Sequence, residues 1–145
     1  MKKRVLVIQG PNLNLTGERE KGVYGSETYD EICAQISDYA EKIGFDCEIF
    51  QSNHEGAIID KLHSARLDCD GIIINAGAYT HYSYAIRDAI SAIRIPCIEV
   101  HMSNIYAREE FRSKSVIAPV CAGHIAGFGK NGYLLALQGL AEILK

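Results

Sequence analysis

The sequence lacks features that mark several classes of protein. It has no tryptophan and only three prolines, and no stretch approaches the roughly 18 apolar residues that a membrane span needs. The apolar run behind the basic N-terminus ends at Ile8, which is too short for a signal peptide. There is no excess of positive charge either, since the net charge is −3 at pH 7. We therefore expect neither a membrane nor a nucleic acid as a partner.

The cysteines do not form a disulfide framework. There are five of them, an odd number, at wide spacings and without a Cys-x-x-Cys pair. Such residues are typical of small buried side chains in a reducing compartment, so we expect the chain to work in the cytoplasm. The 145 residues, 48% of them hydrophobic and 23% charged, predict one globular domain spanning 1–145.

Short apolar runs alternate with amphipathic helical patterns, which is typical of βαβ units around a parallel sheet. Nearly unbroken β-branched runs indicate strands that helices cover on both faces, and two weaker runs complete the sheet, with Pro119 suiting an edge strand. The strong runs are 5–8, 71–74 and 96–100, and the weaker ones are 46–51 and 115–120.

Four helices are predicted between and after these strands. Thr28 and Glu31 match a capping box, and the helix that they begin ends before Gly44. Asn53 is expected to cap the second helix. The third carries the apolar stripe Ile86, Ala89, Ile90 and Ile93, and the fourth spans 133–144. Five strands with these helices predict an α/β fold, a flavodoxin-like, doubly wound, five-stranded parallel sheet in three layers, α/β/α.

Polar residues follow the strands of this predicted sheet. In open α/β sheets the ligand binds beyond the carboxyl ends of the strands. Turn chemistry accounts for the asparagines, glycines and serines there, but it accounts less easily for His81 and His101. The segments concerned are 10–14, 52–56, 75–81 and 99–104.

Several kinds of site fit these segments poorly. The first strand ends without the clustered carboxylates of a magnesium-binding receiver domain. Segment 127–132 matches G-x-G-x-x-G, but only 13 residues follow it, so no βαβ unit can be completed and we interpret it as a loop. Glu99 and His101 lie two apart on a strand and share a face, yet no third ligand stands at a suitable spacing. The sequence therefore predicts no metal site.

Segment 17–25 lies between the first strand and the first helix. It is too polar to bury and holds three glycines, which predicts a mobile lid over the site. A solvated charged loop is the alternative interpretation.

Over essentially its full length the sequence resembles the type II 3-dehydroquinate dehydratases. The resemblance implies the flavodoxin-like fold, no cofactor and no metal, and trimers assembled into a dodecamer. Thr16 and Lys21, near the lid, depart from the residues usual in the family. The matching motifs are 10–14, Arg19 with Tyr24-Gly25, 51–56, 75–81, 99–104 and 107–112.

The resemblance also implies a reaction, the dehydration of 3-dehydroquinate to 3-dehydroshikimate in the shikimate pathway. It begins with loss of the C2 proton beside the C3 ketone and proceeds through an enolate. Tyr24 is implied to be the base, with Arg19 as the cation that favours its ionised form. His101 is implied to be the acid for the departing C1 hydroxyl, with Glu99 holding its ring.

Further residues are implied to hold the substrate and the lid. Asn12 contacts the substrate and helps to keep the lid closed, and Arg108 is a further partner of the lid. The implied substrate contacts are Asn75, Met102 and Ser103 for the carboxylate and His81 and Arg112 for the ring hydroxyls.

Asp88 is implied to complete the site of a neighbouring subunit. Independently, about 100° of rotation per residue places Asp88 roughly opposite the apolar stripe of its predicted helix, so it points away from its own core. A flavodoxin-like nucleotide-binding or regulatory module remains the alternative function.

Overall fold

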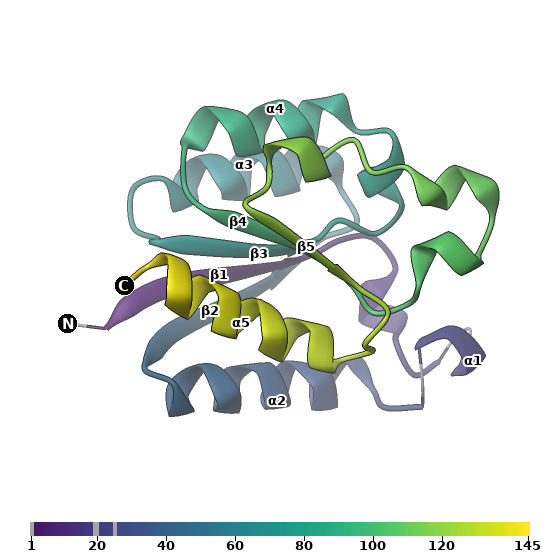
Figure 1. Cartoon of the computed structure of the whole chain (residues 1–145), viewed down its shortest axis with the longest axis horizontal. Coiled ribbons are helices and arrows are strands. Elements are labelled where there is room, and N and C mark those ends of the chain that lie inside the picture. The colour runs from purple at the N-terminus through teal and green to yellow at the C-terminus, as the bar shows by residue number, and fades with distance from the viewer. Residues whose placement is uncertain (1, 19–20, 25) are drawn as a thin grey trace.

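The computed structural model describes residues 2–18, 21–24 and 26–145, except for the side chains of Lys21 and Tyr24. Its middle layer is a parallel sheet in the order β2-β1-β3-β4-β5 (Figure 1). This order confirms the predicted doubly wound α/β fold. The strands are β1 (Lys3–Gln9), β2 (Phe45–Gln51), β3 (Gly71–Asn75), β4 (Cys97–His101) and β5 (Gly123–Ala126).

Helices form the two outer layers. One face of the sheet is covered by α2 (Tyr29–Lys42) and α5 (Asn131–Ile143), and the other by α3 (Glu55–Ala65) and α4 (Tyr84–Ile93) (Figure 1). The shorter elements lie mainly at the carboxyl edge of the sheet. They are α1 (Lys21–Tyr24) and the 3-10 helices η1 (Leu13–Leu15), η2 (Gly77–His81), η3 (Ile105–Ala107), η4 (Glu110–Ser113) and η5 (Ala118–Val120).

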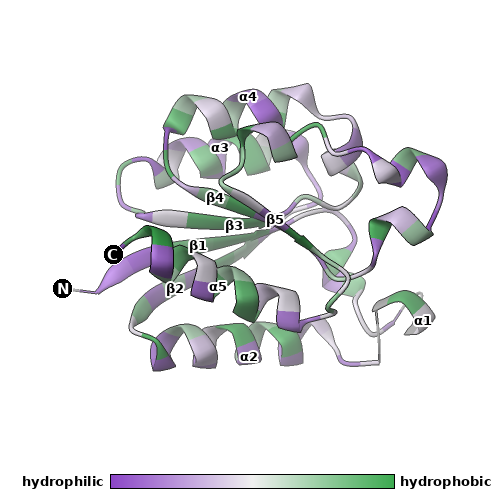
Figure 2. Ribbon diagram, viewed as in Figure 1, coloured by the Kyte–Doolittle hydropathy of each residue, from purple (hydrophilic) through white to green (hydrophobic). Residues whose placement is uncertain are grey.

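Strand β1 contributes to two separate cores. Val5 and Val7 pack with residues of α2 and α5, whereas Leu6 and Ile8 pack with residues of α3 and α4. Successive side chains of a strand point to opposite faces, so a strand between two helical layers needs apolar side chains on both faces where the helices cover it. Figure 2 shows the resulting hydrophobic central strands and the more hydrophilic outer surfaces of the helices. This arrangement explains why the strong β-branched runs identified β1, β3 and β4.

Of the two helix caps that the sequence predicts, the structure contains one. The Thr28 hydroxyl accepts the Glu31 N–H at 3.2 Å, as in the first half of a capping box. The predicted cap at Asn53 is wrong, because α3 is preceded by His54 as its N-cap. Asn53 has another use: its Oδ1 accepts the backbone N–H of Asn12 at 3.0 Å. It therefore joins the loops that follow β1 and β2.

The fifth strand lies later in the chain than predicted. Segment 115–120 is not a strand, and its last three residues form η5 with Pro119 near the start. Val116 and Ile117 are apolar because they are buried in the same cluster as α4, and not because they pair in the sheet. The strand at the edge beside β4 is β5, which pairs with β4. Its sequence, Gly-His-Ile-Ala, carries no β-branched run that would have identified it.

The last helix begins two residues before its predicted start. Segment 127–132, predicted to be a loop, forms a turn with Gly127 and Gly129 at positive φ and then enters α5. Within the described ranges, no helix is both long and apolar enough to cross a membrane.

Candidate active site

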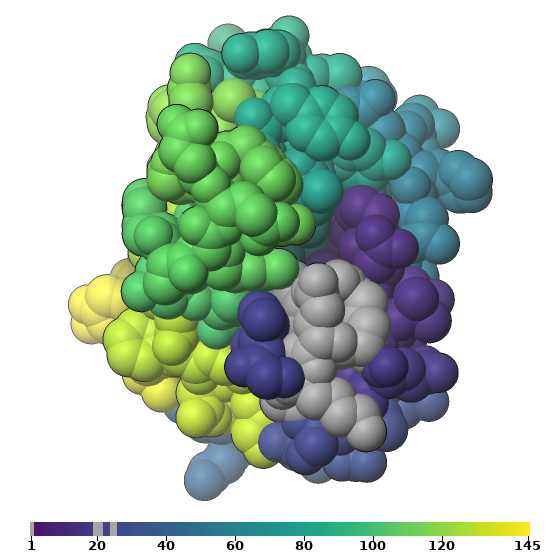
Figure 3. All heavy atoms as spheres, turned by 90° about the vertical axis from the view of Figure 1, so that its right-hand side faces the viewer, coloured from purple at the N-terminus to yellow at the C-terminus, as the bar shows by residue number. Residues whose placement is uncertain are grey.

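A pocket opens at the carboxyl edge of the sheet, as the fold predicts. Figure 3 looks onto this edge and shows the segments after β1, β3 and β4 (purple, teal and green) gathered on one face. Most of the predicted site residues line the pocket, although they come from distant parts of the chain. They are Asn12, Asn75, His81, His101, Met102, Ser103, Arg108 and Arg112.

The loops after β1 and β3 approach each other closely. A Cβ atom on Gly10 would lie 2.6 Å from the carbonyl carbon and oxygen of Ala76, so only glycine permits this approach. The Gly10 N–H donates to the Asn75 carbonyl at 2.7 Å. Asn12 follows with φ of 69°, in the left-handed region that asparagine tolerates better than most residues. Asn12 and Asn75 thereby line the same pocket.

A buried hydrogen-bond network fixes the Asn75 amide. Its Nδ2 donates to the Tyr133 hydroxyl at 2.9 Å, and its Oδ1 accepts the Gly77 N–H at 3.2 Å. The Tyr133 hydroxyl donates in turn to Oε1 of Gln9 at 2.7 Å. An amide nitrogen carries two hydrogens, so Asn75 keeps one donor beyond its bond to Tyr133. The network thus orients a polar donor at the pocket wall.

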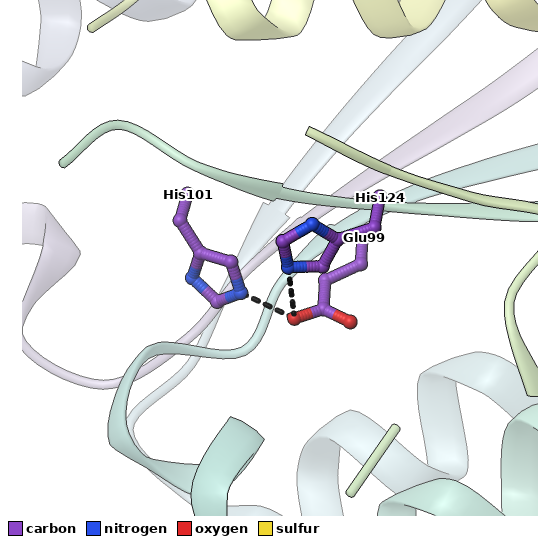
Figure 4. A group of neighbouring side chains, drawn as sticks. All are labelled: Glu99, His101 and His124. Atoms are coloured by element: carbon purple, nitrogen blue, oxygen red, sulfur yellow. Dashed lines mark hydrogen bonds and ion pairs between the residues drawn. The ribbon is translucent and has the colours of Figure 1, made fainter. Parts of the chain in front are cut away.

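Glu99 is fully buried behind His101 and holds its ring. Nε2 of His101 donates to Oε2 of Glu99, and the Ser115 hydroxyl donates to the other carboxylate oxygen at 2.9 Å. An ionised carboxylate can only accept hydrogen bonds, so Nε2 carries the hydrogen. A second imidazole, that of His124, places its Nε2 3.4 Å from the same Oε2 (Figure 4). The described contacts therefore leave Nδ1 as the nitrogen of His101 that Glu99 does not engage.

His81 stands beside His101 with a defined tautomer. Its Nδ1 lies 2.8 Å from the carbonyl oxygen of Lys114, which can only accept, so Nδ1 carries the hydrogen. Burial lowers the pKa of His81 and favours the neutral ring, although the bond to Lys114 acts in the opposite direction. The ring stacks on that of His101 with centroids 6.3 Å apart. A neutral His81 therefore offers its Nε2 as a hydrogen-bond acceptor.

The pocket has a positive wall. Arg108 donates from Nη1 to the Ser103 hydroxyl at 3.2 Å, and Arg112 donates from Nε to Glu109 at 3.1 Å. None of the described residues that line the pocket is acidic. Guanidinium groups favour carboxylate and phosphate ligands, so this wall suits a small anion.

The family comparison agrees with this geometry. The sequence matches the family described as dehydroquinase class II over residues 3–141. The chain belongs to this family.

Relatives and solved structures of the class II dehydroquinase family cover nearly the whole chain. A 3-dehydroquinate dehydratase from Caldicellulosiruptor bescii is 64% identical over 143 residues, 98% of this chain and 99% of that protein. The crystal structure of a type II dehydroquinase from Butyrivibrio crossotus has a TM-score of 0.95 at 52% identity, covering 97% of this chain and 98% of its own. That from Propionibacterium acnes has a TM-score of 0.94 at 44% identity, covering 98% of both chains. The resemblance found in the sequence is thus confirmed.

The structure does not place two of the predicted site residues, Arg19 and the side chain of Tyr24. Arg19 lies outside the described residues, and so does the side chain of Tyr24, whose backbone ends α1. Their neighbours Gly22 and Val23 line a surface hollow together with Met102, Ser103 and Arg108. Gly22 and Val23 of the predicted lid segment therefore adjoin the pocket, while the mobility of the segment stays a prediction.

Asp88 and Thr16 can be placed. Asp88 is exposed on α4, as its position opposite the buried stripe predicted, and it does not line the pocket. Thr16 is buried, and its hydroxyl donates to the Leu13 carbonyl at 2.6 Å. That bond satisfies the buried hydroxyl.

The sequence analysis missed four polar residues around the site: Gln9, Ser115, His124 and Tyr133. Gln9 ends β1 and Tyr133 lies in α5, so their meeting depends on the tertiary fold. The roles of Ser115 and His124 were missed because the fifth strand was predicted at 115–120 and not at Gly123–Ala126. The parallel register pairs Glu99 with His124, and this supplies the third potential metal ligand that spacing alone did not reveal.

Proposed function

We propose that this chain dehydrates 3-dehydroquinate to 3-dehydroshikimate in the shikimate pathway, as one catalytic domain spanning 1–145 and without a cofactor. The observation that carries the proposal is His101, which lines the pocket and is held from behind by the buried Glu99. The reaction needs an acid for a poor leaving group, and an imidazole paired with a buried carboxylate suits that task. The family membership supplies the substrate.

The first chemical step is removal of a proton. The ketone at C3 acidifies the C2–H bond, so a base takes that proton and the electron pair forms an enolate. We assign the base to Tyr24 and the cation that favours its ionised form to Arg19. Both assignments rest on the family motif and on the position of α1 beside the pocket.

The second step is loss of water. The enolate electrons re-form the C3 ketone and the C2–C1 double bond while the C1–O bond breaks, and the departing hydroxyl takes a proton from His101. Since Nε2 of His101 is bonded to Glu99, Nδ1 is the nitrogen that donates. Glu99 stabilises the imidazolium form that precedes this transfer.

The remaining pocket residues bind the substrate. Asn75, Met102 and Ser103 hold the carboxylate, supported by the fixed Asn75 amide. The free Nε2 lone pair of neutral His81 accepts from a ring hydroxyl, and Arg112 contacts the ring hydroxyls as well. Asn12 contacts the substrate and the closed lid, and Arg108, bonded to Ser103, supports the lid.

The proposal extends to assembly and location. We propose trimers that assemble into a dodecamer, with Asp88 of one subunit reaching the site of its neighbour. The exposure of Asp88 on α4 supports such a role. We also propose a cytoplasmic location, which rests on the number and spacing of the cysteines.

The decisive test combines one assay with two variants. Incubation with 3-dehydroquinate should produce the ultraviolet absorbance of a conjugated enone. Tyr24→Phe should abolish turnover and leave substrate affinity within about threefold, because the base acts in the transition state and not in binding. Tyr84→Phe, a matched change at an exposed tyrosine of α4, should retain full turnover.

Three outcomes would contradict the proposal. One is a Tyr24→Phe enzyme within tenfold of the unmodified rate. Another is a lysine adduct trapped by borohydride in the presence of substrate, because the described pocket residues include no lysine and the proposed route forms no Schiff base. The third is no enone at all together with tight nucleotide binding, which would favour the regulatory-module alternative.

A further inference from the structure

Three potential metal ligands converge beneath the floor of the pocket. Glu99 and His101 are two residues apart on β4 and share a face, while His124 is the direct partner of Glu99 on β5. Figure 4 shows both imidazoles pointing at one carboxylate oxygen of Glu99. The three potential ligand atoms all lie within 4.8 Å of one another.

These distances suit a zinc ion with small side-chain shifts. Bonds of about 2.1 Å from a tetrahedral zinc ion place its ligand atoms about 3.4 Å apart. Nε2 of His124 already lies 3.4 Å from Oε2 of Glu99. To bind an ion with all three ligand atoms, the His101 ring would have to move away from the Glu99 carboxylate. The His101 and His124 rings would also have to move slightly closer to each other. Two imidazole nitrogens and one carboxylate oxygen are also a ligand set that Zn²⁺ uses, with a fourth position left for water.

The surroundings of the cluster resemble those of a built metal site. The Ser115 hydroxyl bonds Oε1 of Glu99 at 2.9 Å, which fixes the carboxylate and leaves Oε2 facing the histidines. Hydrogen bonds of this kind orient metal ligands in proteins. The Ser115 hydroxyl also accepts the Ala118 N–H at 3.0 Å, so η5 holds it in place.

Of the three residues, His124 is the one that reaches the surface outside the pocket. The His124 side chain is 26% exposed and lines surface hollows along the β5 edge, one of them shared with Ser115. His101, in contrast, lines the substrate pocket. An ion could therefore reach Glu99 past His124 without entering the pocket.

We propose that Glu99, His101 and His124 bind a divalent late transition-metal ion, Zn²⁺ first among them, and that the bound ion inhibits the enzyme. Coordination replaces the hydrogen on Nε2 of His101 by the metal and breaks the bond to Glu99. The His101 ring then loses the hydrogen bond to Glu99 that holds it in place at the pocket. Binding follows from the geometry alone, whereas inhibition rests on the proposed role of His101.

Binding is tested without reference to activity. Calorimetric titration of the untagged protein with Zn²⁺ should show about one strong site per chain, and His124→Gln should weaken it at least tenfold. His63→Gln, the same change at an exposed histidine of α3, should leave it unaltered. Co²⁺ should give visible bands of a nitrogen and oxygen site without thiolate charge transfer, which separates the cluster from the five cysteines. Circular dichroism checks the fold of each variant, and His124→Asn repeats the test.

Inhibition is tested relative to the metal-free rate of each protein. Micromolar Zn²⁺ should lower turnover of the unmodified enzyme at least tenfold, and a chelator should restore the turnover. Millimolar Mg²⁺ should have no effect, because nitrogen ligands suit Mg²⁺ poorly. His124→Gln should resist the inhibition. Unchanged Zn²⁺ affinity in His124→Gln, or thiolate bands with Co²⁺, would overturn the site. Binding at His124 with no loss of rate would overturn the inhibitory role and leave the proposed dehydration standing.

Discussion

The Thr80 hydroxyl is a buried polar group with no hydrogen-bond partner among the described residues. An unsatisfied buried hydroxyl costs on the order of 1 kcal/mol, so Thr80→Val should stabilise the chain by about that amount. A rise in Tm of about 2–4 °C is expected for a chain of this size, measured by circular dichroism.

Thr16→Val is the matched control. Its buried hydroxyl is bonded to Leu13 at 2.6 Å, so the same substitution there removes a satisfied interaction and should lower Tm by a similar amount. Shifts in the same direction for both variants would show that these hydrogen bonds do not decide the stability at the two positions.

Tyr133 is expected to matter for both stability and substrate affinity. Tyr133→Phe leaves the Asn75 amide and the Gln9 carbonyl without their shared partner, which should cost about 1–3 kcal/mol in urea unfolding. Asn75 also loses its fixed orientation, so substrate affinity should fall at least several-fold.

Tyr39→Phe removes a comparable bond at the surface, where the hydroxyl accepts from Gln138. Water replaces that partner, so the change should cost less than about 0.5 kcal/mol and leave substrate affinity unaltered. Equal effects of the two substitutions would argue that the buried network has no special part in shaping the pocket.

Among the elements, those that are buried on both faces were predictable from sequence. The strands β1, β3 and β4 carry buried apolar residues on both faces because two helical layers cover them. The edge strand β5 was missed because its four residues include a glycine and a histidine. Segment 115–120 was mistaken for a strand because its apolar residues are buried in the same cluster as those of α4. Burial, and not sheet pairing, is what an apolar run reports.

The residues of the candidate site also fall into a group that was predictable from sequence and a group that was not. Residues at the carboxyl ends of strands were predictable because that edge binds ligands in every open α/β sheet, and the family motifs assigned their roles. Ser115, His124 and Tyr133 were not predictable, since each reaches the site through a contact between distant elements. Their residue types are ordinary for the loops and helices in which they lie.

The close contact between the loops after β1 and β3 leads to a prediction about Gly10. Gly10→Ala places a methyl group 2.6 Å from the Ala76 backbone, which cannot yield without moving one loop. Turnover should fall at least about a hundredfold because misplacement of about 1 Å at a site has that effect. Gly56→Ala, in α3 with nothing within 4 Å of the new atom, should keep its rate and gain about 0.5–1 kcal/mol in stability. A fully active Gly10→Ala enzyme would contradict the close approach.

At the scale of the whole molecule, the proposed role of Asp88 makes subunits depend on one another. Tyr24→Phe and Asp88→Arg proteins should each be inactive, but mixed oligomers should regain part of the activity. Some sites would then combine an intact Tyr24 with an intact Asp88 from a neighbour. The rate of refolded mixtures is measured against each parent.

Hybrid formation is checked by native mass spectrometry. Confirmed hybrids that stay as inactive as both parents would mean that Asp88 serves its own subunit or no site at all. Arg87→Ala on the neighbouring position of α4 tests whether any change of charge on this helix has the same effect; it should not abolish turnover.

The bond between Gln9 and Tyr133 joins residues 124 positions apart in the chain. Ribosomes add about 5–20 residues per second, so roughly 6–25 s of synthesis separate the two ends of this bond. During that time Val5 and Val7 lack the cover of α5, and Asn75 lacks its partner. The pocket wall is therefore finished only after the C-terminal helix has left the ribosome, and a nascent chain that stops before Tyr133 should not retain substrate even when its sheet is complete.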